Sequence, residues 1–138
     1  MLREIVTPGA GANGAGRDYT NEEAAAMLRA VLNLFAKWEL TDAQAARLLG
    51  GVTTRSLQRW RGGDAPKLSL DMADRMSYLL GIHKALRLIF KDAERVYGWV
   101  KRPNKEFGDQ SALDVMLKGH MSDLARVRLY LDSARGGW

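Results

Sequence analysis

The chain has 138 residues, of which 46% are hydrophobic and 27% charged, with a formal net charge of +5 and no cysteine. This length fits one domain or two very small ones, and without cysteine the chain has no disulfide, thiolate nucleophile or sulfur-ligated metal site. The only histidines are His83 and His120, too few for a multi-histidine metal site or a pair of histidine acid/base groups.

The positive charge lies in the middle of the chain. Residues 40–105 carry thirteen basic and six acidic side chains, whereas residues 1–39 and residues 106–138 each carry four basic and five acidic ones. A basic centre suggests an anionic partner, with nucleic acid the first candidate, although a solvated face gives the same pattern. No apolar run approaches the roughly 18 residues of a membrane span, and the N-terminus lacks a signal-peptide layout. We therefore expect a cytoplasmic protein without membrane association.

The predicted elements begin after residues 1–19. Residues 8–16 hold four glycines and no large apolar side chain, so a flexible tail is expected there. Thr20 and Glu23 have the spacing of a capping box. Apolar residues then recur at steps of three and four and predict a helix ending near Glu39. They are Met27, Leu28, Val31, Leu32, Phe35 and Trp38.

Two short helices and one long helix follow. Thr41 starts a short helix that Gly50-Gly51 ends, and Thr53 or Thr54 can cap a second helix that runs to about Arg61. A longer amphipathic helix is predicted from the cap Ser69 to Phe90. Gly81 is a candidate kink or break within it.

Three more helices are predicted beyond residue 90. They cover Asp92–Val100, Ser111–Lys118 with Gly119 as the stop, and Ser122–Ala134. No segment alternates with a period of two residues, so no sheet is predicted. The expected fold class is all-α, with about seven helices.

The two short helices and the glycine turn between them have the dimensions of a DNA-binding helix-turn-helix. Taking Arg55 as zero, Gln58 falls at about 300° and Arg59 at about 40°, while Leu57 and Trp60 fall at about 200° and 140°. The polar and apolar side chains are therefore on opposite sides of the second helix. Because arginine can pair with guanine and glutamine with adenine, Arg55, Gln58 and Arg59 are the base-reading candidates.

Other residues of this region are candidates for phosphate contacts, because they lie at the start of the second helix, at its end or in the following loop. These residues are Thr53, Thr54, Arg61 and Lys67. An ordinary amphipathic helix with its arginines in water is the structural alternative. Trp38 and Trp60 are predicted to be core residues rather than stacking platforms for bases.

The C-terminal third carries an ordered set of features that resembles the toxin-binding domain of Xre/MbcA/ParS-type antitoxins. The features are Tyr97-Gly98-Trp99, Pro103-Asn104, Phe107-Gly108, Leu113-Asp114, Gly119, Tyr130-Leu131 and Arg135-Gly136-Gly137-Trp138. The preceding region from Thr20 to Phe90 is similar to the Xre-like helix-turn-helix domain that normally comes before it. Two departures are Ala112, where many members have proline, and Gly50-Gly51, which predicts a looser turn than usual.

The resemblance implies a type II antitoxin that is not an enzyme and needs no cofactor or metal. Residues 91–138 would bind the toxin, most often a RES-domain enzyme that consumes NAD⁺, and residues 20–90 would bind the operon's own promoter DNA. In related complexes the antitoxin's extreme C-terminus covers the toxin's active-site cleft, which carries over to Arg135, Gly136, Gly137 and Trp138. Two glycines give the chain freedom to enter a narrow cleft, and the terminal tryptophan supplies a large anchor.

Several alternatives remain open from the sequence. Tyr130 and Leu131 are candidates for the toxin interface or for the core, whereas Phe107 and Leu113 are predicted in the core. His83 is predicted to be a hydrogen-bonded structural histidine. The competing functions are a helix-turn-helix transcriptional regulator with no toxin partner, and an adaptor that contacts RNA or an acidic protein. Because such DNA-binding proteins usually meet palindromic operators as dimers, we expect a homodimer or a higher hetero-oligomer with the toxin.

Overall fold

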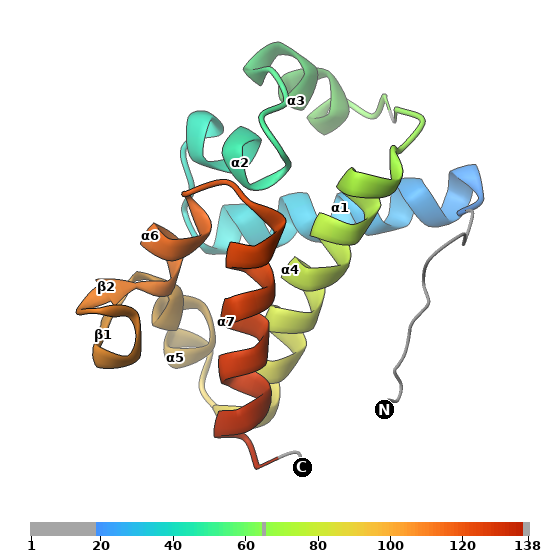
Figure 1. Cartoon of the computed structure of the whole chain (residues 1–138). Helices are drawn as coiled ribbons and strands as arrows, with labels where there is room; N and C mark the ends of the chain where they lie inside the picture. Colours follow the sequence, from blue (N-terminus) through green and yellow to red (C-terminus); the bar gives the residue numbers. More distant parts are fainter. Residues whose placement is uncertain (1–18, 65, 137–138) are drawn as a thin grey trace.

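The computed structural model describes residues 19–64 and 66–136. Nearly all of the predicted tail, and the predicted toxin contacts Gly137 and Trp138, lie outside these residues. Within them the fold is all-α, as predicted, with seven α-helices and a single pair of very short strands. In chain order (Figure 1) the elements are α1 (Asn21–Lys37), α2 (Asp42–Leu48), α3 (Thr54–Arg61), α4 (Leu70–Ile89), α5 (Ala93–Gly98), the 3₁₀ turn η2 (Trp99–Lys101), β1 (Pro103–Asn104), the 3₁₀ turn η3 (Lys105–Phe107), β2 (Gln110–Ser111), α6 (Ala112–Met116) and α7 (Met121–Ala134).

The helix starts follow the local sequence signals. At α1 the Thr20 hydroxyl accepts from the Glu23 amide at 3.0 Å, and the Glu23 carboxylate accepts from the Thr20 amide at 3.0 Å. The same reciprocal pair forms at α2 between Thr41 and Gln44. Each pair satisfies two amides that a helix N-terminus leaves without a partner. The capping box predicted for the first helix is therefore confirmed, and α2 starts with the same arrangement.

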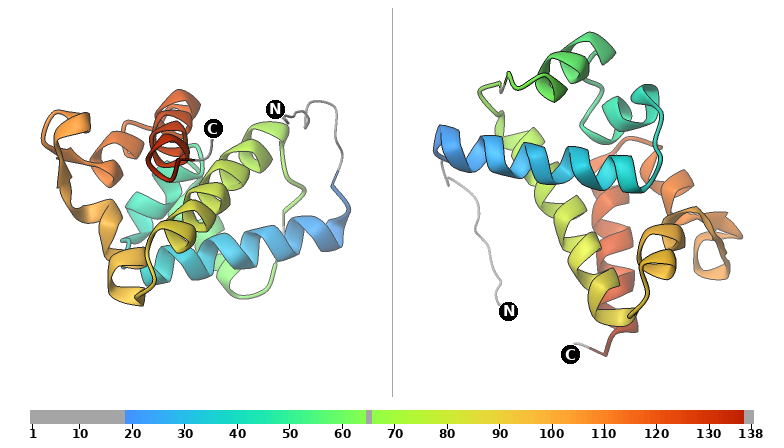
Figure 2. Two further views of the ribbon diagram at one scale, coloured as in Figure 1. Left: turned by 90° about the horizontal axis from the view of Figure 1, so that it is seen from below. Right: turned by 180° about the vertical axis from the view of Figure 1, so that it is seen from behind.

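Helix α4 is the longest helix in the described part of the chain and packs against helices from both ends of it. It packs against α1 and along α7, and Figure 2 shows α1 crossing it while α7 runs beside it. Gly81 does not divide the helix, which is continuous through it. A Cβ at Gly81 would lie 1.7 Å from Nη1 of Arg128, so the missing side chain makes room for an arginine of α7.

One hydrophobic core joins the N-terminal helices to the C-terminal ones. Trp38 is 1% exposed and Trp60 9%, which confirms that both tryptophans belong to the core. Phe107 and Leu113 are also buried, as predicted. Because α4 contributes to this core on both sides, it ties the two predicted domains together. The predicted boundary after residue 90 stays a prediction.

The C-terminal third differs from the prediction in two places. The predicted helix from Asp92 to Val100 is divided into α5 and η2. The prediction of no sheet was wrong, because β1 and β2 pair antiparallel, with Pro103 opposite Ser111. Each strand has only two residues, too few to show the alternation by which a strand is recognised in a sequence.

No helix in the described ranges is long and apolar enough to span a membrane.

Candidate functional site

The turn between α2 and α3 is built by its two glycines. Gly50 and Gly51 have φ angles of +98° and +86°. The Gly51 amide donates to the Ala46 carbonyl at 2.9 Å and the Gly50 amide to the Arg47 carbonyl at 3.1 Å, which is the Schellman pattern at a helix C-terminus. The double glycine was expected to loosen this turn. Instead the turn is fixed by hydrogen bonds that need left-handed backbone, which glycine adopts at little cost.

The faces of α3 are those predicted. Leu57 is 0% exposed and anchors the helix to the core together with Trp60, while Arg55, Gln58 and Arg59 are exposed. Figure 1 shows α3 at one end of the molecule, far from the end of α7. The three polar side chains therefore project from a helix that its inner face holds in place.

The start of α3 is capped by Thr53 rather than Thr54. The Thr53 hydroxyl accepts from the Ser56 amide at 3.0 Å, and Thr54 is the first, exposed residue of the helix. The first turn of α3 contains no acidic side chain. This helix N-terminus is therefore not neutralised from within its own first turn, which suits an incoming phosphate.

Arg61, at the end of α3, points to α2 and not only to solvent. Its guanidinium donates to the carboxylate of Asp42, the first residue of α2. Hydrogen bonding by Arg61, followed by its charge and a hydrogen bond from Gln58, lowers the pKa of Asp42 despite some desolvation. The predicted phosphate contact of Arg61 thus competes with an ion pair that holds α3 on α2.

The turn that joins α6 to α7, residues Leu117–His120, is held by arginines from the N-terminal half, and we name it the α6–α7 turn. Arg47 of α2 donates from Nε to the Leu117 carbonyl at 3.1 Å and from Nη2 to the Lys118 carbonyl at 2.8 Å. Arg75 of α4 donates to the Gly119 carbonyl at 3.0 Å. These carbonyls lie at or just beyond the C-terminus of α6, where a helix leaves acceptors unpaired. The helix-turn-helix is therefore hydrogen-bonded directly to the turn that precedes α7.

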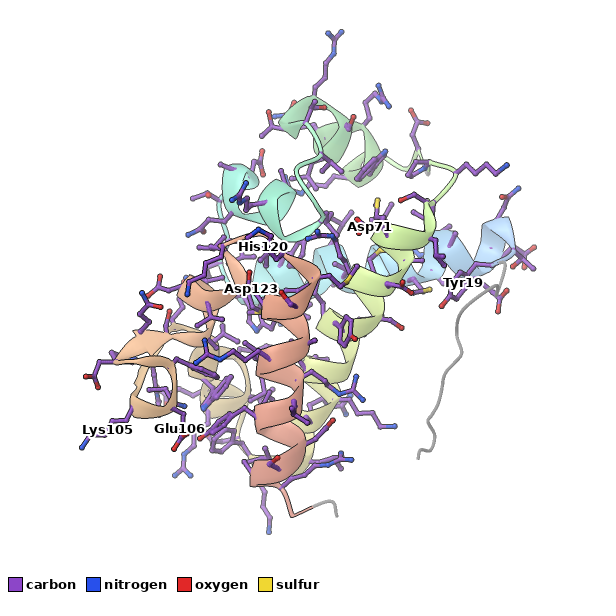
Figure 3. All side chains as sticks on the ribbon, viewed as in Figure 1. Tyr19, Asp71, Lys105, Glu106, His120 and Asp123 are labelled. Atoms are coloured by element: carbon purple, nitrogen blue, oxygen red, sulfur yellow. The ribbon has the colours of Figure 1, made fainter. Side chains whose placement is uncertain are left out.

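His120, the last residue of this turn, contacts Asp123 in the first turn of α7. The His120 amide and its ring Nδ1 each lie 3.1 Å from Oδ2 of Asp123, and Figure 3 shows both residues at the start of α7. His120 is highly exposed.

The predicted toxin-binding residues separate into buried and exposed ones. Leu131 is 1% exposed and belongs to the core, so it offers no direct contact, whereas Tyr130 is partly exposed. The exposed leucine of α7 is Leu129, at 58%, which the sequence pattern did not single out. Arg135 is exposed at the end of α7.

The structure also shows the surroundings of His83. His83 stacks on Tyr97 with ring centroids 5.5 Å apart, and among the described residues its buried Nδ1 has no hydrogen-bond partner, so this atom does not supply the predicted hydrogen bond. Desolvation, with a smaller effect of Arg87, lowers the pKa of His83. Among the residues that the structure describes, no three histidine, aspartate or glutamate side chains gather in a way that could hold a metal ion.

Comparison with known proteins matches two family models to successive parts of the chain. Residues 19–81 match the model of the antitoxin Xre-like helix-turn-helix domain, and residues 85–137 match that of the antitoxin Xre/MbcA/ParS C-terminal toxin-binding domain. The two matches adjoin inside α4. The chain is also 40% identical over 114 residues to the uncharacterized protein y4oB of Sinorhizobium fredii, an alignment that covers 81% of this chain and 86% of that protein.

These matches cover nearly all of the described residues and agree with the fold. They favour the antitoxin interpretation over a transcriptional regulator without a toxin partner. The chain belongs to the Xre/MbcA/ParS-type antitoxins of toxin–antitoxin systems, non-enzymatic regulators in which a helix-turn-helix domain precedes a toxin-binding domain.

Proposed function

We propose that this antitoxin neutralises a RES-domain toxin that degrades NAD⁺, and that it represses its own operon by binding promoter DNA. The DNA-binding part is residues 20–90 and the toxin-binding part residues 91–138. The observation that carries the DNA proposal is the exposed set Arg55, Gln58 and Arg59 on a helix anchored by two buried side chains.

The base-reading assignment goes to these three residues because they lie on the exposed face of α3. Within residues 19–64 and 66–136, neither Arg55 nor Arg59 forms an ion pair. Each bidentate pair with a base is worth about 1–3 kcal/mol of discrimination. Thr53 and Thr54 stand at the start of α3, where they would contact one phosphate. Arg61, at the end of α3, would contact another in competition with its ion pair to Asp42.

A gel-shift experiment with the operon's promoter tests this assignment. The variant R55A/R59A should lose promoter-specific binding, and the slope of log K against log salt should fall by about 0.9 for each phosphate that the variant no longer neutralises. K84A/R87A removes the same amount of positive charge from the C-terminal half of α4, and it serves as the matched control. Equal binding by R55A/R59A and wild type would refute the assignment of α3 as the recognition helix.

The toxin proposal assigns the active-site cover to Arg135, Gly136, Gly137 and Trp138. Its support is the family's toxin-binding domain, together with the exposed position of Arg135 and Gly136 at the end of α7. Co-expression with the neighbouring open reading frame tests it. Wild type should restore growth, and deletion of residues 135–138 should weaken protection. A neighbour that is harmless alone, or toxic despite the antitoxin, would refute the RES-toxin proposal, and full protection by the truncated chain would refute the cover.

The DNA proposal carries an expectation for assembly. A palindromic operator is read by two copies of a helix-turn-helix related by two-fold symmetry. We therefore propose a homodimer, or a higher hetero-oligomer with the toxin, as the DNA-binding form. Light scattering of the free antitoxin and of the complex measures this directly, and a single antitoxin chain per operator would contradict it.

A further inference from the structure

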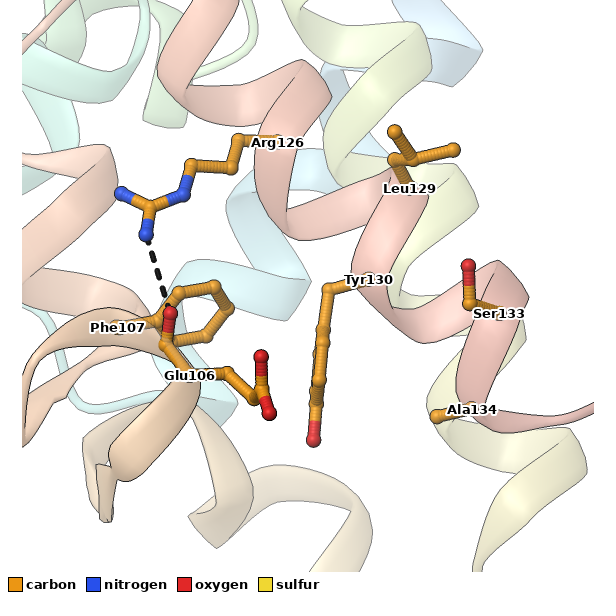
Figure 4. A pocket seen from close by; sticks show the side chains of 7 residues that line it. All are labelled: Glu106, Phe107, Arg126, Leu129, Tyr130, Ser133 and Ala134. Atoms are coloured by element: carbon orange, nitrogen blue, oxygen red, sulfur yellow. Dashed lines mark hydrogen bonds between the residues drawn. The ribbon is translucent and has the colours of Figure 1, made fainter.

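An open pocket of about 560 Å³ lies between η3 and the second half of α7. Figure 4 shows its lining, which combines an aromatic floor, one exposed leucine, one guanidinium and one carboxylate. The lining residues are Glu106, Phe107, Arg126, Leu129, Tyr130, Ser133 and Ala134. We call this hollow the α7 pocket.

The floor of the α7 pocket is already ordered without an occupant. Phe107 meets Tyr130 edge-on with ring centroids 5.2 Å apart, and it meets Trp99 edge-on at 6.4 Å. Arg126 lies over the Phe107 ring, 5.2 Å from its centroid, and donates to the Glu106 carbonyl at 3.1 Å. A partner would therefore find a rigid site, which reduces the entropy lost on binding.

The chemistry of the lining favours a protein side chain over nucleic acid. One cation and one carboxylate give the lining no net charge, whereas nucleic-acid sites are strongly positive. Leu129 leaves 58% of its surface in water at the pocket, whereas the exposed leucines Leu70 and Leu88 lie outside the lining. An exposed leucine beside an aromatic hollow is the arrangement of an anchor site in a protein interface.

The spacing between α7 and Trp138 indicates which protein occupies the pocket. Ala134 lines the pocket, and Trp138 is four residues further along the chain. Four residues span at most about 14 Å when fully extended. A cleft that receives Trp138 must therefore have its rim within that distance of Ala134, and so close to the α7 pocket.

We propose that the α7 pocket receives an apolar side chain from the rim of the toxin's active-site cleft, with Leu129 packed beside it. This inference rests on the proposed function, because it takes the C-terminal residues to enter that cleft. The α7 pocket then fixes the direction in which these residues leave α7. The short chain end gains effective concentration at the cleft because a structured contact holds it nearby.

The variant L129R tests the proposal, with L88R as the matched control. Both leucines are exposed, at 58% and 62%, so neither substitution disturbs the core. The measurement is the dissociation constant for the RES-domain toxin encoded by the neighbouring gene. L129R should weaken binding at least about ten-fold, and L88R should change it less than about two-fold. S133W, which fills the pocket from α7, should reproduce the loss, and circular dichroism verifies that each variant is folded.

The outcomes distinguish this inference from the proposed function. Wild type that neither binds nor neutralises the toxin refutes the proposed function itself. Tight wild-type binding that L129R and S133W leave unchanged refutes the α7 pocket as a toxin contact and leaves the proposed function intact. The weakening should persist when L129R is combined with deletion of residues 135–138, because the pocket binds through folded residues.

Two other occupants of the α7 pocket give different results, and either would overturn the proposal. If a second antitoxin fills it, L129R converts the free antitoxin to a smaller species in light scattering while the toxin affinity per chain stays the same. If the chain's own Trp138 fills it, W138A shifts the NMR signals of the Phe107 and Tyr130 rings in the free antitoxin, and L129R leaves toxin affinity unchanged.

Discussion

Replacing Gly119 by alanine should weaken the hydrogen-bonded contact between the helix-turn-helix and the α6–α7 turn, and so lower the free energy of unfolding. Gly119 has a φ angle of +92°, which L-residues with a side chain rarely adopt. A Cβ at this position would also lie 2.7 Å from Nε of Arg47. The guanidinium can move away, but its hydrogen bonds to the Leu117 and Lys118 carbonyls would then break.

The magnitude follows from these two effects. A positive φ costs a residue with a side chain about 1–2 kcal/mol. Two exposed hydrogen bonds from Arg47 contribute together about 1–2 kcal/mol. G119A should therefore lower the free energy of unfolding by about 2–4 kcal/mol, and R47A alone by about 1–2 kcal/mol. Because both variants lose the same hydrogen bonds, the double variant should be more stable than their sum predicts by about 1–2 kcal/mol.

Urea denaturation of wild type, the two single variants and the double variant measures this coupling. G108A is the matched control, because Gly108 has a φ of +67° and a Cβ there would meet nothing within 4 Å. It should cost only the backbone strain, and its effect should add to that of R47A. If G119A and R47A were additive within about 0.5 kcal/mol, Arg47 would not hold the α6–α7 turn and the reasoning would be refuted.

Three further predictions concern other parts of the chain. W60A should lower the free energy of unfolding by about 3–5 kcal/mol in urea denaturation, because it empties the core under α3; a decrease below about 1 kcal/mol would contradict this. D42N should remove a part of the acid dependence of stability, since the pKa of Asp42 is lowered by Arg61 and its stabilisation is present above the unfolded pKa and lost as pH falls through the folded one. Parallel stability-against-pH curves below pH 5 would contradict it. H83F should reduce the loss of stability on acidification from about pH 7 towards pH 5, because the lowered pKa of His83 means that the unfolded chain binds its proton first. Urea denaturation at both pH values measures this. If the free energy of unfolding fell by the same amount between pH 7 and pH 5 in H83F and in wild type, His83 would not be responsible for the loss of stability.

The sequence predicts features whose causes are local. Thr20 and Glu23 lie three residues apart and satisfy each other's amides, so the start of α1 can be recognised without knowledge of the fold. The faces of α3 follow equally from the helical period, because Leu57 and Arg55 need only their spacing to be assigned to opposite sides. These predictions depend on a few neighbouring residues and are correct.

The candidate site also depends on contacts between distant segments, and there the sequence is a poor guide. Arg47 contacts carbonyls 70 and 71 residues away, and no pattern around it marks it as different from an arginine in water. The choice between Leu129 and Leu131 is different, because the helical period decides it. Leu131 follows the buried residues Leu124 and Val127 at steps of three and four, and Leu129 lies off that stripe.

The partners of the arginines limit how much of the positive charge is available to DNA. Of the thirteen basic residues between positions 40 and 105, Arg47 and Arg75 bind backbone carbonyls across the molecule, and Arg61 and Arg95 pair with aspartates of their own chain. These four guanidiniums have structural partners already, so the net charge of the segment overstates what DNA can use. The affinity for promoter DNA should therefore fall with R55A and much less with R95A, although both variants remove one positive charge. A similar loss of affinity for both would mean that the whole basic segment attracts DNA as a diffuse field, and that α3 has no special role in contacting DNA.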